Sequence, residues 1–367
     1  MSTLALGLPF ARREQAVSHF RSAGIPTRRV EDWKYSDLAK ALGETALSED
    51  TASWKLGALP AGVEMFDLAD VHAPDWVKSH LGSLKENALS AASLAFSSGG
   101  VALRVTGVVE TPVSLEFFGK GNLRALIVLE KNAQLTLVES ANGDDQRNVG
   151  VEIILGANAQ LHHVRLARAN VAIQIEEVAM TVAQDAVYTA HYASFGGKLS
   201  RLELDIALEG ANAQAHLSGV CVLHGDSHAD ITTRVTHAVG HTQSTQLFKK
   251  VAGGKSRAVY QGKVIVSQGA NGADSRQNAK ALLLGNQAEA DLKPELEIFA
   301  DDVKCAHGAA VGDLDADSLF YLRARGIPED DARDLLIHAF LEDAIAGIAR
   351  DDLRDQVRMA VNEALAQ

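Results

Sequence analysis

The chain has 367 residues, of which 47% are hydrophobic and 5% aromatic, and its formal net charge is −12. A chain of this length can bury a large core, which aliphatic side chains must supply because aromatic ones are scarce. The acidic balance argues against nucleic acid or an anionic membrane as a partner, because phosphate groups are bound by clustered Lys and Arg.

The cysteine count and the absence of targeting signals predict a cytoplasmic protein. Two cysteines, Cys221 and Cys305, provide no disulfide framework for a chain of this size and fit a reducing compartment. Met1–Phe10 lacks a basic region followed by a long apolar run, and no stretch of about 18 apolar residues occurs. We therefore expect neither export nor a membrane span.

Residues 1–95 are predicted to form a helical and irregular N-terminal region. A helix over Pro9–Ala23 is followed by Gly24, a residue typical of helix C-termini. The next segment contains Trp33 and Tyr35, and we interpret it as a connector that these two rings anchor to the rest of the protein.

Residues 96–312 change to short runs of strand-like sequence separated by turn residues. Short strands alone would also suit a sandwich or a barrel. The runs that begin this region are Val101–Val105, Val113–Phe117, Ala125–Leu129, Leu135–Glu139, Val151–Leu155 and Leu161–Leu166.

A recurring turn decides between these architectures. Its Asn or Asp residues, at steps of 26, 27 and 27, are Asn132, Asn158, Asp185 and Asn212, and Asn271 and Asn286 repeat the turn less regularly. Asn and Asp tolerate the left-handed backbone that a tight corner needs. A fixed period of this length with strands and recurrent corners is typical of a parallel β-helix, in which each coil stacks on the last.

Residues 313–367 return to a helical pattern. Asp315 or Asp317 is expected to cap a short helix, Pro328 opens a longer one, and a last helix begins at about Asp351. The side chains expected on the buried face of the long helix are Leu335, Leu336, Phe340, Ile345 and Ile348. We expect these helices to close one end of the β-helix, where a terminal coil would expose unpaired edges.

The run Val251–Ser256 contains Gly-Gly-Lys-Ser and invites comparison with a phosphate-binding loop. The Walker A spacing requires a glycine at the position of Lys249, so a glycine turn between two strands explains the run better. The chain is therefore expected to bind no nucleotide itself and not to be an ATPase.

Histidines are frequent in the later coils, but none shows a zinc-binding spacing with a carboxylate or a thiol, so we interpret them as structural polar residues. They are His162, His163, His191, His216, His224, His228, His237 and His241. Cys221 lies between two valines and is expected to be a small buried thiol.

Cys305 and His307 are the candidate metal ligands. Two residues apart in a strand, they point to the same face at roughly 6–7 Å between their Cα atoms. Thiolate and imidazole together suit zinc, copper or iron–sulfur chemistry. Two ligands leave such a site half built, so it either keeps open positions or takes ligands from another chain. A purely structural role for the pair is the alternative.

The chain from His237 to Ile327 closely resembles the SufD family of iron–sulfur cluster assembly proteins, and the N-terminal segment Arg29–Ser36 is similar too. The motifs that carry the resemblance are Ser244–Lys249, Ala258–Val266, Leu282–Leu284, Lys293–Ala309 and Leu319–Ile327. The related SufB chains are longer and carry a cysteine shortly before the segment matching Leu282–Gly285. Asn278, Ala279 and Lys280 stand there instead, which favours the SufD type.

The resemblance implies a mainly β fold, a right-handed parallel β-helix with N-terminal and C-terminal helical regions. It implies a non-catalytic scaffold that pairs through its β-helix with a SufB paralogue, or with itself, and binds the ABC-type ATPase SufC through its C-terminal helices. We expect the pairing within about residues 235–310, at Val264 and Ile265. A nascent iron–sulfur cluster would form transiently at that subunit interface, with His307 and Cys305 as its ligands.

Two functions of other classes stay open from the sequence. A parallel β-helix also serves polysaccharide-active enzymes, although these are usually exported and present aromatic platforms for sugars. A structural β-helix adaptor without any metal contact is the second.

Overall fold

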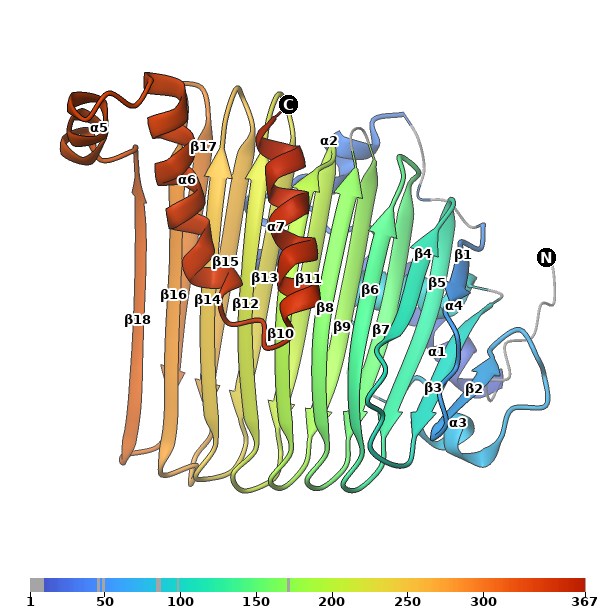
Figure 1. Cartoon of the computed structure of the whole chain (residues 1–367). Coiled ribbons are helices and arrows are strands. Elements are labelled where there is room, and N and C mark those ends of the chain that lie inside the picture. The colour runs from blue at the N-terminus through green and yellow to red at the C-terminus, as the bar shows by residue number, and fades with distance from the viewer. Residues whose placement is uncertain are drawn as a thin grey trace.

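The computed structural model describes residues 10–44, 47, 50–83, 87–97, 99–169 and 172–366 (Figure 1). Residues 1–9 lie outside these ranges. They include Pro9, where the first helix was expected to begin, and most of the segment in which no export signal was expected. Within the described ranges, no helix is both long enough and apolar enough to cross a membrane.

The centre of the molecule is a flattened parallel β-helix, as the repeated turns predicted. Its strands are β3 (Gly100–Val105), β4 (Val113–Phe118), β5 (Gly121–Leu129), β6 (Gln134–Asn142), β7 (Arg147–Leu155), β8 (Gln160–Ala169), β9 (Ile173–Val182), β10 (Val187–Gly196), β11 (Leu199–Leu208), β12 (Gln214–Leu223), β13 (His228–His237), β14 (Gln243–Ala252), β15 (Arg257–Val266), β16 (Ala273–Leu283), β17 (Glu289–Ile298) and β18 (Val303–Gly312).

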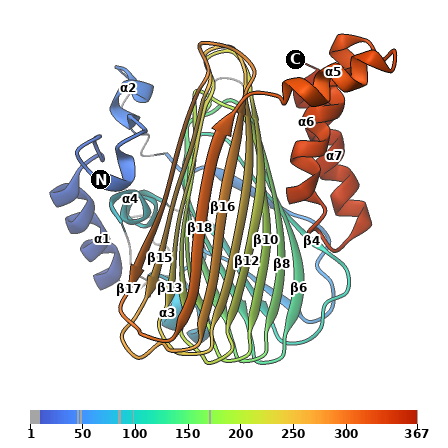
Figure 2. The ribbon, with the colours of Figure 1, turned by 90° about the vertical axis from the view of Figure 1, so that its left-hand side faces the viewer.

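Strands of alternate number form the two broad sheets, which face each other across the core (Figure 2). In the described part of the chain, one nine-stranded sheet runs β1-β4-β6-β8-β10-β12-β14-β16-β18 and the other β17-β15-β13-β11-β9-β7-β5-β3-β2. The pairs β1–β4 and β2–β3 are antiparallel, while the ladders from β3 and β4 onward are parallel and in register. The same position of successive coils therefore stacks into a column.

The corners adopt the backbone that the sequence predicted. Asn132, Asn158, Asp185 and Asn212 have φ angles of 63°, 58°, 57° and 61°. The side chain of Asn158 also donates a hydrogen bond to that of Asn132 over 3.1 Å. Later coils use other residues in this conformation: His241 at 59°, and Gly272 in place of the expected Asn271.

The helices of the N-terminal region cover the outer face of the sheet that contains β5 to β17, while β1 and β2 extend the two sheets at their first edge. The elements of this region are α1 (Phe10–Ala23), η1 (Glu31–Trp33), α2 (Leu38–Leu42), β1 (Ser53–Leu56), β2 (Val63–Asp67), α3 (Asp75–His80) and α4 (Ala88–Phe96). Trp33 is buried as expected, and the Arg201 guanidinium lies 4.1 Å from its ring centre. Arg201 in turn is paired with buried Asp230, which also accepts a hydrogen bond from Ser36.

The C-terminal helices do not close the end of the β-helix, contrary to expectation. The chain continues through α5 (Ala316–Ala324), α6 (Glu329–Ile345) and α7 (Asp351–Leu365), and α6 and α7 lie along the outer face of the other sheet (Figure 1). The reason is apolar surface: Val164, Val220 and Val251 point outward from their strands and pack against these two helices. Covering that face removes these apolar side chains from water.

The buried face of α6 was predicted partly wrongly. Leu335 is 51% exposed and Leu336 only half-buried, whereas Ile337 and Leu341 are buried against the sheet. The predicted cap is confirmed for Asp315, whose carboxylate accepts a 2.7 Å hydrogen bond from the backbone N–H of Ser318.

Two smaller predictions are confirmed. The Gly-Gly-Lys-Ser run forms the turn between β14 and β15, with Gly254 at φ +66°. Cys221 is fully buried, and burial raises the pKa of its thiol.

The left-handed corners make a direct stability prediction. Asn158→Val is expected to lower the free energy of unfolding by about 1–2 kcal/mol, because a β-branched side chain clashes with the backbone at φ 58°. Urea unfolding followed by circular dichroism measures the change. Asn158→Gly is the control, since glycine adopts this conformation freely, and an equal loss in both variants would contradict the explanation.

Candidate functional site

The last coil leaves both sheets with an unpaired strand. Each edge strand is bonded on one side only, β17 to β15 and β18 to β16 (Figure 2). Three large apolar side chains are exposed along this end: Ile298 at 40%, Phe299 at 63% and Val311 at 46%. Unpaired N–H and C=O groups beside exposed apolar side chains form a template for pairing with another chain.

This edge lies almost wholly within the expected range, residues 235–310, but not at the two residues named for the contact. Val264 and Ile265 lie on β15, which is hydrogen-bonded to β13 on one side and to β17 on the other. Val264 is moreover fully buried in the core. The reason is position in the stack: β15 belongs to the coil before the last, so its backbone groups already have partners, whereas β17 and β18 at this end of the stack can accept a further strand.

Cys305 and His307 both lie on β18, on the face that continues the inner wall. Their register partners on β16 are Ser275 and Gln277, which are buried in the interior. The side chain of Cys305 is half-buried, and this burial raises the pKa of its thiol. His307 is exposed. The two predicted donors therefore sit at the open mouth of the solenoid, pointing to the same side.

A column of hydroxyl groups continues inward from Cys305. Its partner Ser275 lies 2.7 Å from Ser244 in the preceding coil, measured between the Oγ atoms. Ser244 Oγ is 2.9 Å from Nε2 of His237, and Nδ1 of that ring is 2.7 Å from Thr242 Oγ1. Burial lowers the pKa of His237 to about 4, so this imidazole is neutral at physiological pH and serves the hydrogen-bonded column.

A second polar column continues inward from His307. Its partner Gln277 donates from Nε2 to the Tyr260 hydroxyl over 3.0 Å. Tyr260 donates to Gln246 Oε1, also over 3.0 Å, and Thr233 donates to the same oxygen over 2.6 Å. The tyrosine is fully buried, and burial raises the pKa of its hydroxyl. Hydrogen-bonded polar side chains therefore fill the interior directly behind Cys305 and His307.

The ligand count stays at two within one chain. Among the described residues, no three His, Cys, Asp or Glu side chains are grouped so that they could hold a metal ion. Cys305 and His307 alone would therefore be too few donors for a four-ligand iron–sulfur site.

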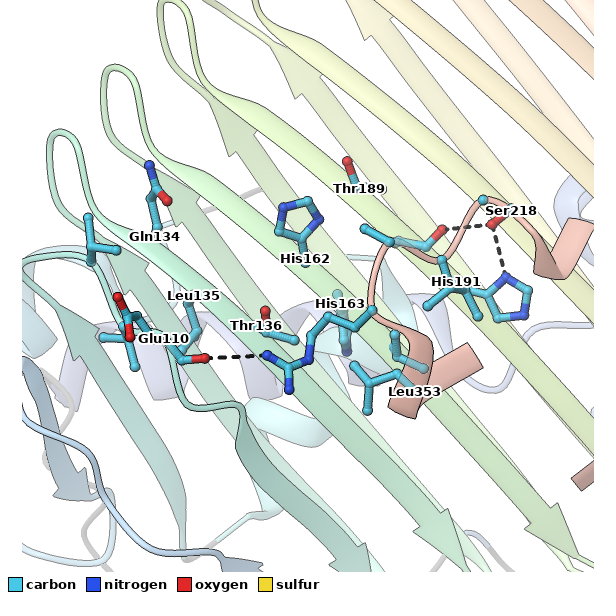
Figure 3. A pocket seen from close by; sticks show the side chains of 18 residues that line it. Glu110, Gln134, Leu135, Thr136, His162, His163, Thr189, His191, Ser218 and Leu353 are labelled. Carbon is cyan, nitrogen blue, oxygen red and sulfur yellow. Dashed lines mark hydrogen bonds between the residues drawn. The ribbon is translucent and has the colours of Figure 1, made fainter. Parts of the chain in front are cut away.

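Apart from His237, which belongs to the column behind Cys305, histidines of the earlier coils lie elsewhere. His162 and His191 line a cavity of about 390 Å³ between the outer face of β6 to β12 and the connection from α6 to α7 (Figure 3). His191 Nδ1 lies 2.9 Å from Ser218 Oγ, and burial lowers the pKa of this histidine to about 4. Arg350 also lines this cavity and donates a hydrogen bond to the backbone carbonyl of Glu110 over 3.5 Å. This agrees with their interpretation as structural residues.

A second exposed apolar surface lies on the C-terminal helices. Phe320 and Tyr321 on α5 are 74% and 57% exposed, and Leu335 on α6 is 51% exposed. None of the residues of α5 is buried. A helix that projects from the body with large apolar side chains in solvent needs a partner to cover them.

Sequence reasoning found the two donors but missed their supports. One column of stacked positions contains Ser244, Ser275 and Cys305. The column two residues further along the strands contains Gln246, Gln277 and His307. A polar residue at the same place in three successive coils is a signal that aligning the later coils would have revealed. The weaker corner repeat after Asn212 hid that alignment.

Comparison with known proteins agrees with this architecture. Residues 119–340 match the family described as SUF system FeS cluster assembly, SufBD core domain, and residues 8–46 match the SufBD protein N-terminal region. The chain is 28% identical to the iron-sulfur cluster assembly protein SufD of Escherichia coli K12, over 96% of this chain and 93% of that protein.

The match to two further relatives covers a smaller part of those proteins. The chain is 33% identical to the iron-sulfur cluster assembly SufBD family protein slr0076 of Synechocystis, over 71% of this chain and 59% of that protein. It is 30% identical to the protein ABCI7, chloroplastic, of Arabidopsis thaliana, over 68% and 57% respectively. The resemblance drawn from the sequence is confirmed, and the chain belongs to the SufBD family of iron–sulfur cluster assembly proteins, of the SufD type.

Proposed function

We propose that this chain is a non-catalytic scaffold subunit of a cytoplasmic iron–sulfur cluster assembly complex. The observation that carries the proposal is the placement of Cys305 and His307 on an edge strand that is paired on one side only. A donor pair at an unpaired edge can be completed only by the chain that pairs there. Family membership supports the same role.

The partner at the open edge would be a SufB-type paralogue, or a second copy of this chain. Extending both sheets would give the unpaired groups of β17 and β18 hydrogen-bond partners and would cover Phe299 and Val311. A paralogue is favoured because it can bring different donors to the interface. A second copy would bring another Cys305 and His307.

The C-terminal helices would bind a SufC-type ABC ATPase. The support is the exposed apolar group on α5 and α6, which lies on a part of the molecule that no other element covers. Nucleotide binding would belong to that subunit, since the Gly-Gly-Lys-Ser run of this chain is a turn between strands.

The cargo of the shared site would be a nascent iron–sulfur cluster, held transiently. His307 is the more accessible donor, because it is exposed while Cys305 is half-buried. A neutral imidazole ligates iron and is released more readily than a thiolate, which suits a cluster that must be passed on. Cys305 would add a second donor or support the interface.

Substitutions at the edge strands test the pairing. Phe299→Asp and Val311→Asp are expected to weaken dimerisation by more than tenfold, because each places a charge in the proposed apolar contact. Sedimentation velocity of the co-expressed paralogue complex measures the effect. Val71→Asp, which alters an equally exposed valine in the N-terminal region, is the control. Intact dimers with both edge variants would contradict this placement.

A substitution on α5 tests the ATPase contact. Phe320→Ala is expected to weaken SufC binding by about 2 kcal/mol or more, as the loss of a central aromatic side chain does at protein interfaces. Isothermal titration with purified SufC measures the affinity. Met359→Ala removes a comparably exposed apolar side chain from α7 and should leave the affinity unchanged. Equal affinities for wild type and Phe320→Ala would move the contact elsewhere.

Removal of the imidazole tests the cluster site. His307→Ala should abolish cluster formation in the anaerobically purified complex while leaving complex assembly intact, and Cys305→Ala should reduce it less. Iron analysis and the absorption spectrum measure the cluster. The exposed Lys304, on the opposite face of the same strand, provides the control Lys304→Ala. Wild-type cluster levels in His307→Ala would refute the assignment.

A further inference from the structure

The buried amide of Gln277 has a hydrogen bond on one side only. The side chain lies in the interior at 2% exposure, and its Nε2 donates to the Tyr260 hydroxyl. Its Oε1 is buried and has no hydrogen-bond partner. A buried carbonyl oxygen without a donor is rare in folded proteins, and it indicates a place where a donor belongs.

The hydrogen-bond network fixes which way this amide faces. The single proton of the Tyr260 hydroxyl goes to Gln246 Oε1, so the tyrosine oxygen can only accept from Gln277. Gln277 must therefore turn its nitrogen toward Tyr260. Its Oε1 is left on the other side of the amide.

The chain leaves space for this amide on the opposite sheet. Gly262 on β15 faces it, and a Cβ atom at that position would lie 1.9 Å from Gln277 Nε2 and 2.4 Å from the Tyr260 hydroxyl oxygen. Any larger residue would displace the amide. The position of Gln277 is thus set by hydrogen bonds at one end and by a glycine-sized space beside it.

The next coil places a histidine at the register position beside Gln277. His307 is the register partner of Gln277, and in-register parallel strands, about 4.8 Å apart, put partner side chains on the same face. A neutral imidazole carries one N–H and one free nitrogen. It can therefore donate to an amide oxygen and still bind a metal ion.

We propose that Gln277 is a positioning residue for His307: its Oε1 accepts the imidazole N–H and so directs the other ring nitrogen to the open edge. The proposal rests on His307 acting as a ligand, as set out above. Metal-bound histidines commonly donate their second ring N–H to an oxygen acceptor, which fixes the tautomer and the ring orientation. Here the acceptor is itself held by Tyr260 and Gln246.

The tautomer of His307 tests this hydrogen bond without any cluster. Nitrogen-15 NMR of the histidine-labelled isolated chain, with His307→Ala to assign the signal, reports which ring nitrogen carries the proton. One tautomer should dominate in wild type and in Gln277→Glu, which keeps an oxygen acceptor. Gln277→Leu should show a mixture. Asn278→Leu removes an exposed amide from the same strand and should behave as wild type.

A second variant protects the test against simple misfolding of Gln277→Leu. Gly262→Ala keeps the glutamine but pushes its amide aside, so it should also yield mixed tautomers. A mixture in wild type, or one dominant tautomer in both Gln277→Leu and Gly262→Ala, would overturn the proposal.

Iron binding in the co-expressed complex completes the test. Gln277→Leu should weaken iron retention against a chelator by roughly 10- to 100-fold, the usual effect of removing such a supporting group, while Asn278→Leu should not. Unchanged retention in Gln277→Leu would overturn the positioning role. A cluster retained in His307→Ala would contradict the proposed function. If the tautomer of His307 still depended on Gln277 in that case, the hydrogen bond itself would stand.

Discussion

In-register stacking of parallel coils is the constraint on which the rest of this structure depends. Each strand takes its hydrogen bonds from the coil before and the coil after, and each inward side chain lies on its equivalent in the neighbouring coil. The arrangement gives each interior strand a backbone partner on both sides and leaves the last coil paired on one side only. Apolar columns build the core, and polar residues are tolerated inside where the next coil supplies a partner.

Deep in the core, the same stacking stabilises charged side chains. Arg165 bonds both Glu139, at 2.9 Å, and Glu176, at 2.7 Å, all three buried. Burial raises the pKa of Glu176 to about 8, so it carries a proton at neutral pH. Burial would also raise the pKa of Glu139, but His163, whose Nε2 lies 3.3 Å from Glu139 Oε2, and the charge of Arg165 hold it below its usual value. One arginine thus neutralises one carboxylate, and the second stays uncharged.

The sequence predicted the features that depend on local backbone chemistry, namely the corners and a helix start. Asn158 and its equivalents mark the corners because few residues adopt φ near 60°, and Asp315 marks a helix start because its carboxylate accepts a backbone N–H. The placement of α6 and α7 was not predictable in this way, since Val164 on an outer face reads like a core valine. Whether an apolar strand position faces the core or a covering helix is decided by tertiary packing.

The open edge explains why the candidate donors and the unsatisfied amide occur together. Helices lie against the outer faces of both sheets (Figure 2). The inner face of the last coil has no further coil against it, so its side chains reach solvent there. Ser244 and Ser275 find partners in each other, whereas Cys305 and His307 have no following coil of this chain above them. Cys305, His307 and the unpartnered Gln277 Oε1 all lie where the stack is interrupted. In the proposed complex, a second β-helix that continues the stack would supply further ligands and cover the last coil in one step.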